Sequence, residues 1–252
     1  MSDAAATNQP LTVALVHGAF ADSSSWNGVI ERLQKHNVRV TTIPNPLRGI
    51  SIDGAYVRSA LKQIPGRVLA VGHSYGGAVI TNAATGLKNV VGLVYVAAFA
   101  PKEGETLLEV DKGSRDSVLF SALVPRQYPT ADGTATEFSI DPPKTREAFA
   151  GDLSDAQIAL IAATQRPISE VAFGEPSGPP AWKSLPSWAV VPTGDKAIGT
   201  DIVRFYAERA GATITELQGS HVIMISQPEA SPTSSSPRSP RSAESPSDTM
   251  SD

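Results

Sequence analysis

The chain has 252 residues, no cysteine, and 21 basic against 25 acidic side chains, which gives a net charge of −4. This length can bury a sizeable apolar core without staples, and the lack of cysteine excludes disulfides, thiolate metal sites and a cysteine nucleophile. The slightly acidic balance argues against nucleic acid as a partner. The longest apolar run, residues 90–100, is about half of the ~20 residues that a membrane span needs. No secretory signal is evident at the start, so the sequence predicts a cytoplasmic protein without a membrane partner.

Apolar runs rich in Val, Ile and Leu alternate with amphipathic stretches along the chain. This alternation is typical of a parallel sheet covered by helices on both faces. It predicts an α/β fold with a mostly parallel sheet of about six strands. The strands are expected at residues 12–16, 38–43, 67–71, 90–96, 188–191 and 213–217, and helices at residues 24–36, 52–63, 75–87 and 201–210.

The alternation breaks after the fourth strand, between residues 101 and 186. Prolines and short helical candidates fill this stretch, and one of them starts at Ser154, where Gln157 completes the spacing of a capping box. An insertion of this size between two core strands predicts a helical lid. The lid belongs to a single domain over residues 11–230.

The two ends of the chain differ in composition from that domain. Residues 1–10 are polar and alanine-rich, and residues 231–252 contain 9 Ser and 4 Pro without Val, Ile, Leu, Phe, Tyr or Trp. Segments of this kind cannot bury enough apolar surface to offset the entropy lost on ordering. Both ends are therefore expected to be disordered.

A candidate nucleophile lies in the sequence Gly72-His73-Ser74-Tyr75-Gly76, which matches the G-x-S-x-G pattern. The pattern stands where a predicted strand ends and a predicted helix begins. A serine at such a turn exposes its Oγ at the carboxyl edge of the sheet, and the glycines let strand and helix cross closely. The context favours a nucleophilic Ser74 over an ordinary glycine-rich turn.

A serine nucleophile needs a base and an acid that orients the base. Of the four histidines, His36 is expected on the far side of the sheet, His73 is expected to point away from Ser74, and His17 precedes a turn. His221 follows the last predicted strand and is the candidate base. Asp195 follows the strand before it and is the candidate acid, so the order is Ser, Asp, His. Glu103, Glu105 and Asp201 are competing acids.

Two backbone N–H groups are candidates for an oxyanion hole. They belong to Ala19, in the turn after the first strand, and to Tyr75, directly after the candidate nucleophile. Phe20 is the candidate substrate-binding residue. Other aromatic side chains are considered as lining an apolar pocket, although for each alone a place in the core is favoured: Trp26, Tyr75, Phe120, Tyr128, Phe138, Phe149, Phe173 and Trp182. The sequence has no histidine pair at metal-ligand spacing and no phosphate-binding glycine motif.

With these residues in place, the chain resembles the α/β-hydrolase superfamily, and most closely its small esterase branch of plant methylesterases, hydroxynitrile lyases and bacterial serine esterases. The resemblance covers residues 11–230 and implies an α/β-hydrolase fold. It implies Ser74 as nucleophile, His221 as base and acid, Asp195 as orienting acid, and Ala19 and Tyr75 as oxyanion donors. The implied reaction is hydrolysis of small or medium carboxylic esters through an acyl-enzyme, by a monomer or homodimer without a cofactor.

The chain departs from this branch in two places. Hydroxynitrile lyases of the branch often carry a lysine after the histidine, whereas Val222 stands here. A lyase, a cofactor-free perhydrolase and a non-catalytic ligand-binding protein of the same fold remain alternatives. Family members also continue into a final amphipathic helix, whereas here the Ser/Pro segment follows residue 230. We hypothesise a frameshift, because bases that encode Ser-Pro-Thr-Ser-Ser encode Val-Ala-Asp-Leu-Ile in another reading frame.

Overall fold

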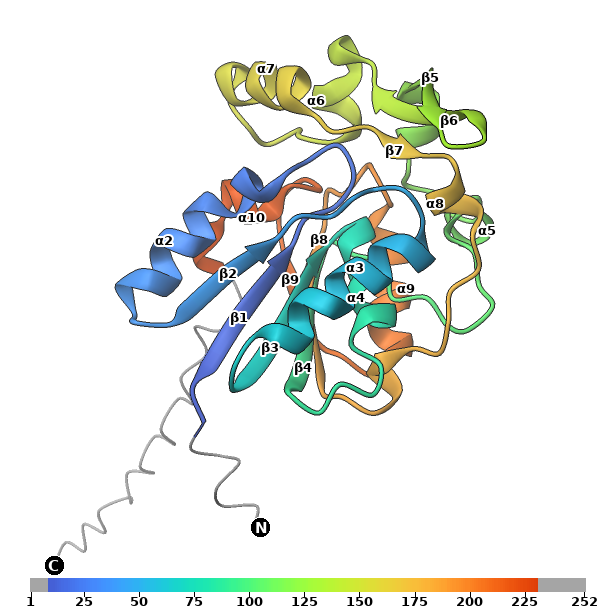
Figure 1. The fold of residues 1–252 in the computed structure, drawn as a ribbon. Coiled ribbons are helices and arrows are strands. Elements are labelled where there is room, and N and C mark those ends of the chain that lie inside the picture. Colours follow the sequence, from blue (N-terminus) through green and yellow to red (C-terminus); the bar gives the residue numbers. More distant parts are fainter. Residues whose placement is uncertain (1–8, 231–252) are drawn as a thin grey trace, which may run out of the picture.

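A computed structural model describes residues 9–230 of the chain (Figure 1). The predictions on residues 1–8 and on the Ser/Pro segment 231–252, the frameshift among them, lie outside the described residues. No helix within residues 9–230 has both the length and the apolar character that crossing a membrane requires.

The centre of the molecule is a six-stranded sheet in which every neighbouring pair is parallel. Its order is β2-β1-β3-β4-β8-β9, so the chain reverses direction across the sheet between β1 and β3, and such switch points place binding sites at the carboxyl ends of the strands. All six predicted strands are confirmed within about two residues: β1 (Leu11–Val16), β2 (Arg39–Ile43), β3 (Arg67–His73), β4 (Val90–Val96), β8 (Ser187–Pro192) and β9 (Thr213–Leu217).

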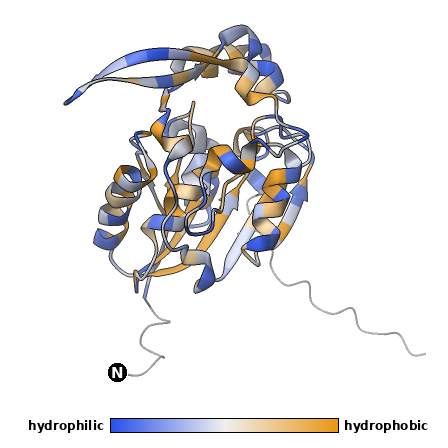
Figure 2. Cartoon of the chain, turned by 90° about the vertical axis from the view of Figure 1, so that its right-hand side faces the viewer, coloured by the Kyte–Doolittle hydropathy of each residue, from blue (hydrophilic) through white to orange (hydrophobic). Residues whose placement is uncertain are grey.

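Helices cover both faces of this sheet (Figure 1). α3 (Ile50–Gln63) packs on α4 (Tyr75–Ala83), and α2 (Asn27–Lys35) lies on the opposite face with α10 (Ile223–Ser226). α9 (Thr200–Arg209) packs beside β8. Figure 2 shows hydrophobic segments along the central strands and the helices beside them, and the buried apolar residues of these elements form one core.

Two predicted helices differ from the structure at their ends. The helix expected over residues 24–36 begins as a 3-10 turn, η1 (Ser23–Trp26), because the carboxylate of Asp22 accepts the backbone N–H of Ser24 and caps this turn. The helix expected over residues 75–87 ends at Ala83, three residues before Gly86 adopts a positive φ of 72°. A left-handed glycine of this kind commonly follows a helix end.

The segment between β4 and β8 lies over the carboxyl ends of the core strands (Figure 1). It contains helices and also a three-stranded antiparallel sheet in the order β5-β6-β7, which the prediction of a helical lid did not include. Its elements are α5 (Leu107–Asp111), η2 (Leu119–Ala122), β5 (Leu123–Thr130), β6 (Gly133–Ile140), η3 (Pro142–Lys144), α6 (Thr145–Ala148), α7 (Asp155–Thr164), β7 (Ile168–Ser169), α8 (Val171–Gly174) and η4 (Ala181–Lys183).

The capping box predicted for this insertion is confirmed at the start of α7. Ser154 Oγ accepts the backbone N–H of Gln157 at 3.4 Å, and Gln157 Oε1 accepts the backbone N–H of Ser154 at 3.1 Å. Two otherwise unpaired backbone donors are thereby satisfied, which fixes where α7 begins.

A buried ion pair joins the start of the insertion to α9. Arg209 donates from Nη1 and Nη2 to the two carboxylate oxygens of Glu105 at 2.8 and 2.6 Å, and Nη2 also donates to the carbonyl of Ala100. Only 8% of the Glu105 side chain and 19% of the Arg209 side chain are exposed. Removing one partner would leave the other charge buried without compensation.

We therefore expect the Glu105→Gln substitution to lower the free energy of unfolding by about 3 kcal/mol. Urea denaturation followed by circular dichroism measures the change. Glu103→Gln is the matched control, because Glu103 is exposed two residues away and should shift the stability by less than about 0.5 kcal/mol. Equal effects of the two substitutions would contradict the assignment of the ion pair.

Candidate active site

Ser74 occupies a strained turn between β3 and α4. Its φ of 54° and ψ of −125° lie outside the regions that a non-glycine residue usually adopts. The turn is possible because glycines surround it: a Cβ on Gly76 would lie 2.6 Å from the Val16 carbonyl oxygen, and one on Gly77 would lie 2.5 Å from that of Phe99. The predicted strand-turn-helix setting of Ser74 is therefore present.

The loops after β8 and β9 bring Asp195 and His221 together. His221 Nδ1 lies 2.7 Å from Asp195 Oδ2, and both residues are 1% exposed. The other carboxylate oxygen, Oδ1, accepts the backbone N–H groups of Ala197 and Ile198 at 2.8 and 3.1 Å. One oxygen of Asp195 thus orients the imidazole, and the other fixes the loop that carries the carboxylate.

The competing acids have other partners or positions. Glu105 pairs with Arg209, and Asp201 accepts from the hydroxyl of Ser114 and the backbone N–H of Arg115. Glu103 is exposed. Among these four acids, Asp195 is the one that contacts His221.

His73 supports His221, a role that the sequence analysis did not predict. Its Nε2 donates to the backbone carbonyl of His221 at 3.0 Å, and the two ring centroids are 4.7 Å apart. Burial, with His221 nearby, holds the pKa of His73 well below its usual value of 6.5. Its neutral ring can therefore pack against His221 without placing a second positive charge there.

His17 is buried in the loop that follows β1. Its Nδ1 lies 2.8 Å from the Gly18 carbonyl oxygen, while Nε2 accepts the backbone N–H of Asn45 at 3.0 Å and an N–H of Arg166 at 3.3 Å. Burial lowers the pKa of His17 to about 4, and the charge of Arg166 acts in the same direction. His17 thus fixes the loop as a neutral imidazole and lies apart from the Asp195 and His221 pair.

The low pKa of His17 predicts a loss of stability in acid. In the unfolded chain the His17 imidazole is protonated below about pH 6.5, whereas in the folded protein it stays neutral down to about pH 4. The stability that a neutral His17 provides is present above pH 6.5 and is lost as the pH falls toward 4, by about 3 kcal/mol. Urea denaturation at several pH values should show a shallower decline for His17→Gln than for the wild type.

The matched control for this pH dependence is His36→Gln. His36 is exposed at the end of α2, so its replacement should leave the slope of stability against pH unchanged. A His17→Gln variant that declines as steeply as the wild type between pH 6.5 and 4 would contradict the prediction.

The candidate oxyanion donors both lie close to Ser74, since Tyr75 follows it in the chain and Ala19 belongs to the loop that contacts its turn. Phe20 donates its backbone N–H to the carbonyl of Arg166 at 3.0 Å, whereas no backbone acceptor within residues 9–230 takes the N–H of Ala19. Tyr75 is the first residue of α4, where a backbone N–H has no acceptor within the helix. A Cβ on Gly18 would lie 2.5 Å from Ser74 Cβ, so the loop of Ala19 touches the turn of Ser74.

The side chain of Tyr75 is buried and held by an acid. Its hydroxyl donates to Asp53 Oδ2 at 2.8 Å, and the same carboxylate accepts the backbone N–H groups of Arg48 and Gly49. Burial raises the pKa of Asp53 above its usual value. The contact of Asp53 with Tyr75 could not be predicted from the sequence, because an acid in the first turn of a helix ordinarily indicates only a favourable charge at the helix start. Tyr75, considered for the pocket, is instead anchored in the core.

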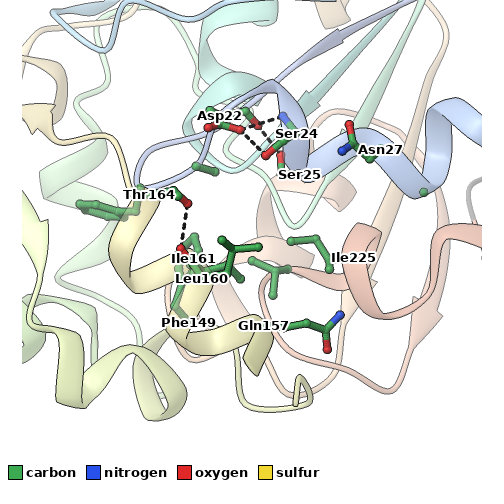
Figure 3. Close-up of a pocket in the computed structure, with 14 residues that line it drawn as sticks. Asp22, Ser24, Ser25, Asn27, Phe149, Gln157, Leu160, Ile161, Thr164 and Ile225 are labelled. Carbon is green, nitrogen blue, oxygen red and sulfur yellow. Dashed lines mark hydrogen bonds between the residues drawn. The ribbon is translucent and has the colours of Figure 1, made fainter. Parts of the chain in front are cut away.

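A cavity of about 320 Å³ lies between η1, α2, α7 and α10 (Figure 3), and neither Ser74 nor His221 is among the residues that line it. Phe20 and Phe149 both line it, with their ring centroids 6.0 Å apart, and the Phe149 ring lies 5.1 Å from that of His221. The other aromatic side chains considered for a pocket lie elsewhere in the described structure. Phe120 and Phe138 pack on Phe173, Tyr128 lies under Arg48, Trp182 donates to Pro101, and Trp26 packs on His73.

Within residues 9–230, the structure has no group of three or more His, Asp or Glu side chains arranged as metal ligands. A basic side chain lies next to the loop that carries Ala19: Arg166 donates hydrogen bonds to His17 Nε2 and to the carbonyl of Asn45.

Comparisons with known proteins agree with this architecture. Residues 13–231 match the family model described as the alpha/beta hydrolase family, and no curated protein sequence matches the chain. Similar solved structures include a polyneuridine aldehyde esterase, with 19% identity, a TM-score of 0.73 and coverage of 87% of this chain and 95% of the other. A methylesterase from Arabidopsis has 18% identity and a TM-score of 0.71, covering 86% and 94%. A pyrethroid hydrolase from Sphingobium faniae JZ-2 has 20% identity and a TM-score of 0.68, covering 87% and 93%. At these identities the likeness shows the fold.

Proposed function

The chain belongs to the alpha/beta hydrolase family, and from its site we propose that it is a serine esterase that cleaves small or medium carboxylic esters. The observation that carries the proposal is the buried contact of 2.7 Å between His221 Nδ1 and Asp195 Oδ2, together with the strained turn of Ser74, whose preceding residue His73 contacts His221. A histidine oriented in this way can act as the base that a serine hydroxyl needs. The esterases among the similar structures support the same reaction class.

In the proposed reaction, His221 Nε2 takes the proton of Ser74 as Oγ attacks the ester carbonyl carbon. The negative charge that forms on the carbonyl oxygen is stabilised by the backbone N–H groups of Ala19 and Tyr75. Collapse of this intermediate breaks the bond to the alcohol oxygen, which receives the proton from His221. Water then attacks the acyl-enzyme while His221 takes its proton, the bond between Ser74 Oγ and the carbonyl carbon breaks, and Oγ receives the proton from His221 as the carboxylic acid leaves.

We extend the proposal to a cytoplasmic enzyme that acts as a monomer or homodimer, with Phe20 in contact with the substrate. Phe20 is buried, and it lines the cavity beside the site. Size-exclusion chromatography with light scattering distinguishes the two oligomeric states. Cyanohydrin cleavage and peracid formation are the alternative reactions on the same residues, and assays of mandelonitrile and of peracid formation beside ester hydrolysis separate them.

The proposal is tested by labelling the purified protein with a fluorophosphonate probe and by following hydrolysis of p-nitrophenyl acetate. The wild type should be labelled at one serine and should turn over the ester. Ser74→Ala should abolish labelling and lower kcat by about 10⁴-fold to 10⁶-fold. Turnover that survives this substitution, or wild-type protein without label or turnover, would overturn the proposal.

A further inference from the structure

The cavity beside His221 has the size and lining of a site for an apolar group. Its volume of about 320 Å³ lies at the lower end of the range for small-molecule sites. Aromatic and aliphatic side chains make up part of its lining, and they favour an apolar ligand because its surface leaves water on binding: Phe20, Phe149, Leu160, Ile161, Val222 and Ile225.

Helix α7 turns one face toward this cavity. Gln157, Leu160, Ile161 and Thr164 follow the i, i+3, i+4, i+7 spacing of one helix face, and all four line the cavity (Figure 3). Leu160 is 63% exposed, so an apolar side chain borders the cavity where it opens to solvent. The neighbouring Ala163 lies on another face of the helix and does not line this cavity.

Two residues that line the cavity connect it to His221. Phe149 lines the cavity and also lies 5.1 Å from the His221 ring, and Val222 lines it directly after His221 in the chain. During acylation the histidine donates its proton to the alcohol oxygen, so the alcohol half must lie on the histidine side of the cleaved bond. The acyl half stays attached to Ser74.

The charge of the lining adds a second restriction. Asp22 is the one ionisable residue among the fourteen that line the cavity, and none of them is basic. A carboxylate on the bound group would be repelled by Asp22 and would meet no cation among the lining residues. The lining therefore favours neutral groups.

We propose that this cavity binds the alcohol half of a neutral ester with an extended apolar alcohol. The inference rests on the proposed esterase function and names its substrate class. It gives Ile161, Leu160 and Thr164 a role in specificity that none of the comparisons assigns.

Hexyl acetate and ethyl hexanoate test the proposal, because these isomers have the same composition and place the long chain on opposite halves of the ester. Each methylene that the cavity buries raises kcat/KM by about fourfold. We expect kcat/KM for hexyl acetate to exceed that for ethyl hexanoate at least tenfold. Ile161→Trp should fill the cavity, lower kcat/KM for hexyl acetate at least tenfold and leave that for methyl acetate within twofold. Ala163→Trp is the matched control on another face of α7 and should change neither value.

Thr164→Phe is a second variant that fills the cavity from the same helix, and it should have the same selective effect if Ile161→Trp fails to fold. Asp22→Asn should at least halve the preference of the enzyme for hexyl acetate over the anionic ester 6-acetoxyhexanoate, since Asn retains the capping role at η1. Equal turnover of the two isomers, or a preference for ethyl hexanoate, would overturn this inference while the esterase function stands. A wild type that cleaves no ester and takes no fluorophosphonate label would overturn the esterase function itself, and this inference with it.

Discussion

Replacing Asp195 with asparagine is expected to lower kcat for ester hydrolysis by about 10⁴-fold while leaving the fold intact. The two oxygens of Asp195 have separate partners, since Oδ1 accepts the backbone N–H groups of Ala197 and Ile198 while Oδ2 contacts His221 Nδ1. The asparagine oxygen can keep the backbone contacts, but its NH₂ group then faces the imidazole. His221 would have to accept at Nδ1 and carry its proton on Nε2, where it could no longer receive the proton of Ser74.

Steady-state assays with p-nitrophenyl acetate measure the loss of kcat, and the melting temperature in thermal denaturation shows whether the variant is folded. Asp201→Asn is the matched control, because Asp201 is another partly buried acid that accepts hydrogen bonds from a hydroxyl and a backbone N–H. It should leave kcat within about twofold. An Asp195→Asn enzyme with kcat near that of the wild type, or a loss of similar size in Asp201→Asn, would show that Asp195 does not orient the base.

The core of this fold could be predicted from the sequence because its strands are buried on both faces. Runs such as Val90–Val96 are mostly apolar, and six of the seven residues in this run are buried. The strands β5 and β6 were not predicted, although they pair with each other over the whole length of both strands. Six of the eight residues of β5 are exposed and two of them are proline, so this strand has no apolar alternation to detect, and β6 is fully buried only at its last two residues.

The candidate site shows a similar division. Ser74 and His221 were accessible to sequence reasoning because a glycine pattern marks the first and because the chain has four histidines. The roles of His73 and Asp53 were not accessible, since each depends on a contact across at least 22 residues of chain. The proposed binding of the alcohol half of an ester could not be inferred from the sequence either, because it depends on where α7 lies relative to His221 in the fold.

The second large effect is expected from Gly18→Ala, which should lower kcat by at least about 100-fold. A Cβ at this position would lie 2.5 Å from Ser74 Cβ and 2.8 Å from the His73 carbonyl oxygen, both parts of the turn that carries the candidate nucleophile. Neither atom belongs to the far end of a flexible side chain, so the loop after β1 and the turn of Ser74 must move apart. Ala19 follows Gly18 directly, and its N–H would therefore shift away from the position where the oxyanion forms.

The measurement is kcat for p-nitrophenyl acetate together with the melting temperature of each variant. Gly54→Ala is the matched control, because Gly54 lies inside α3 and its added Cβ would come no closer than 3.5 Å to Asn82 Cβ. Alanine is favoured over glycine within a helix by about 1 kcal/mol, so this variant should be as stable as the wild type or more stable, with unchanged kcat. A folded Gly18→Ala enzyme with full activity would show that the oxyanion donors do not depend on the contact between this loop and Ser74, and Ala19 would then lose its proposed role.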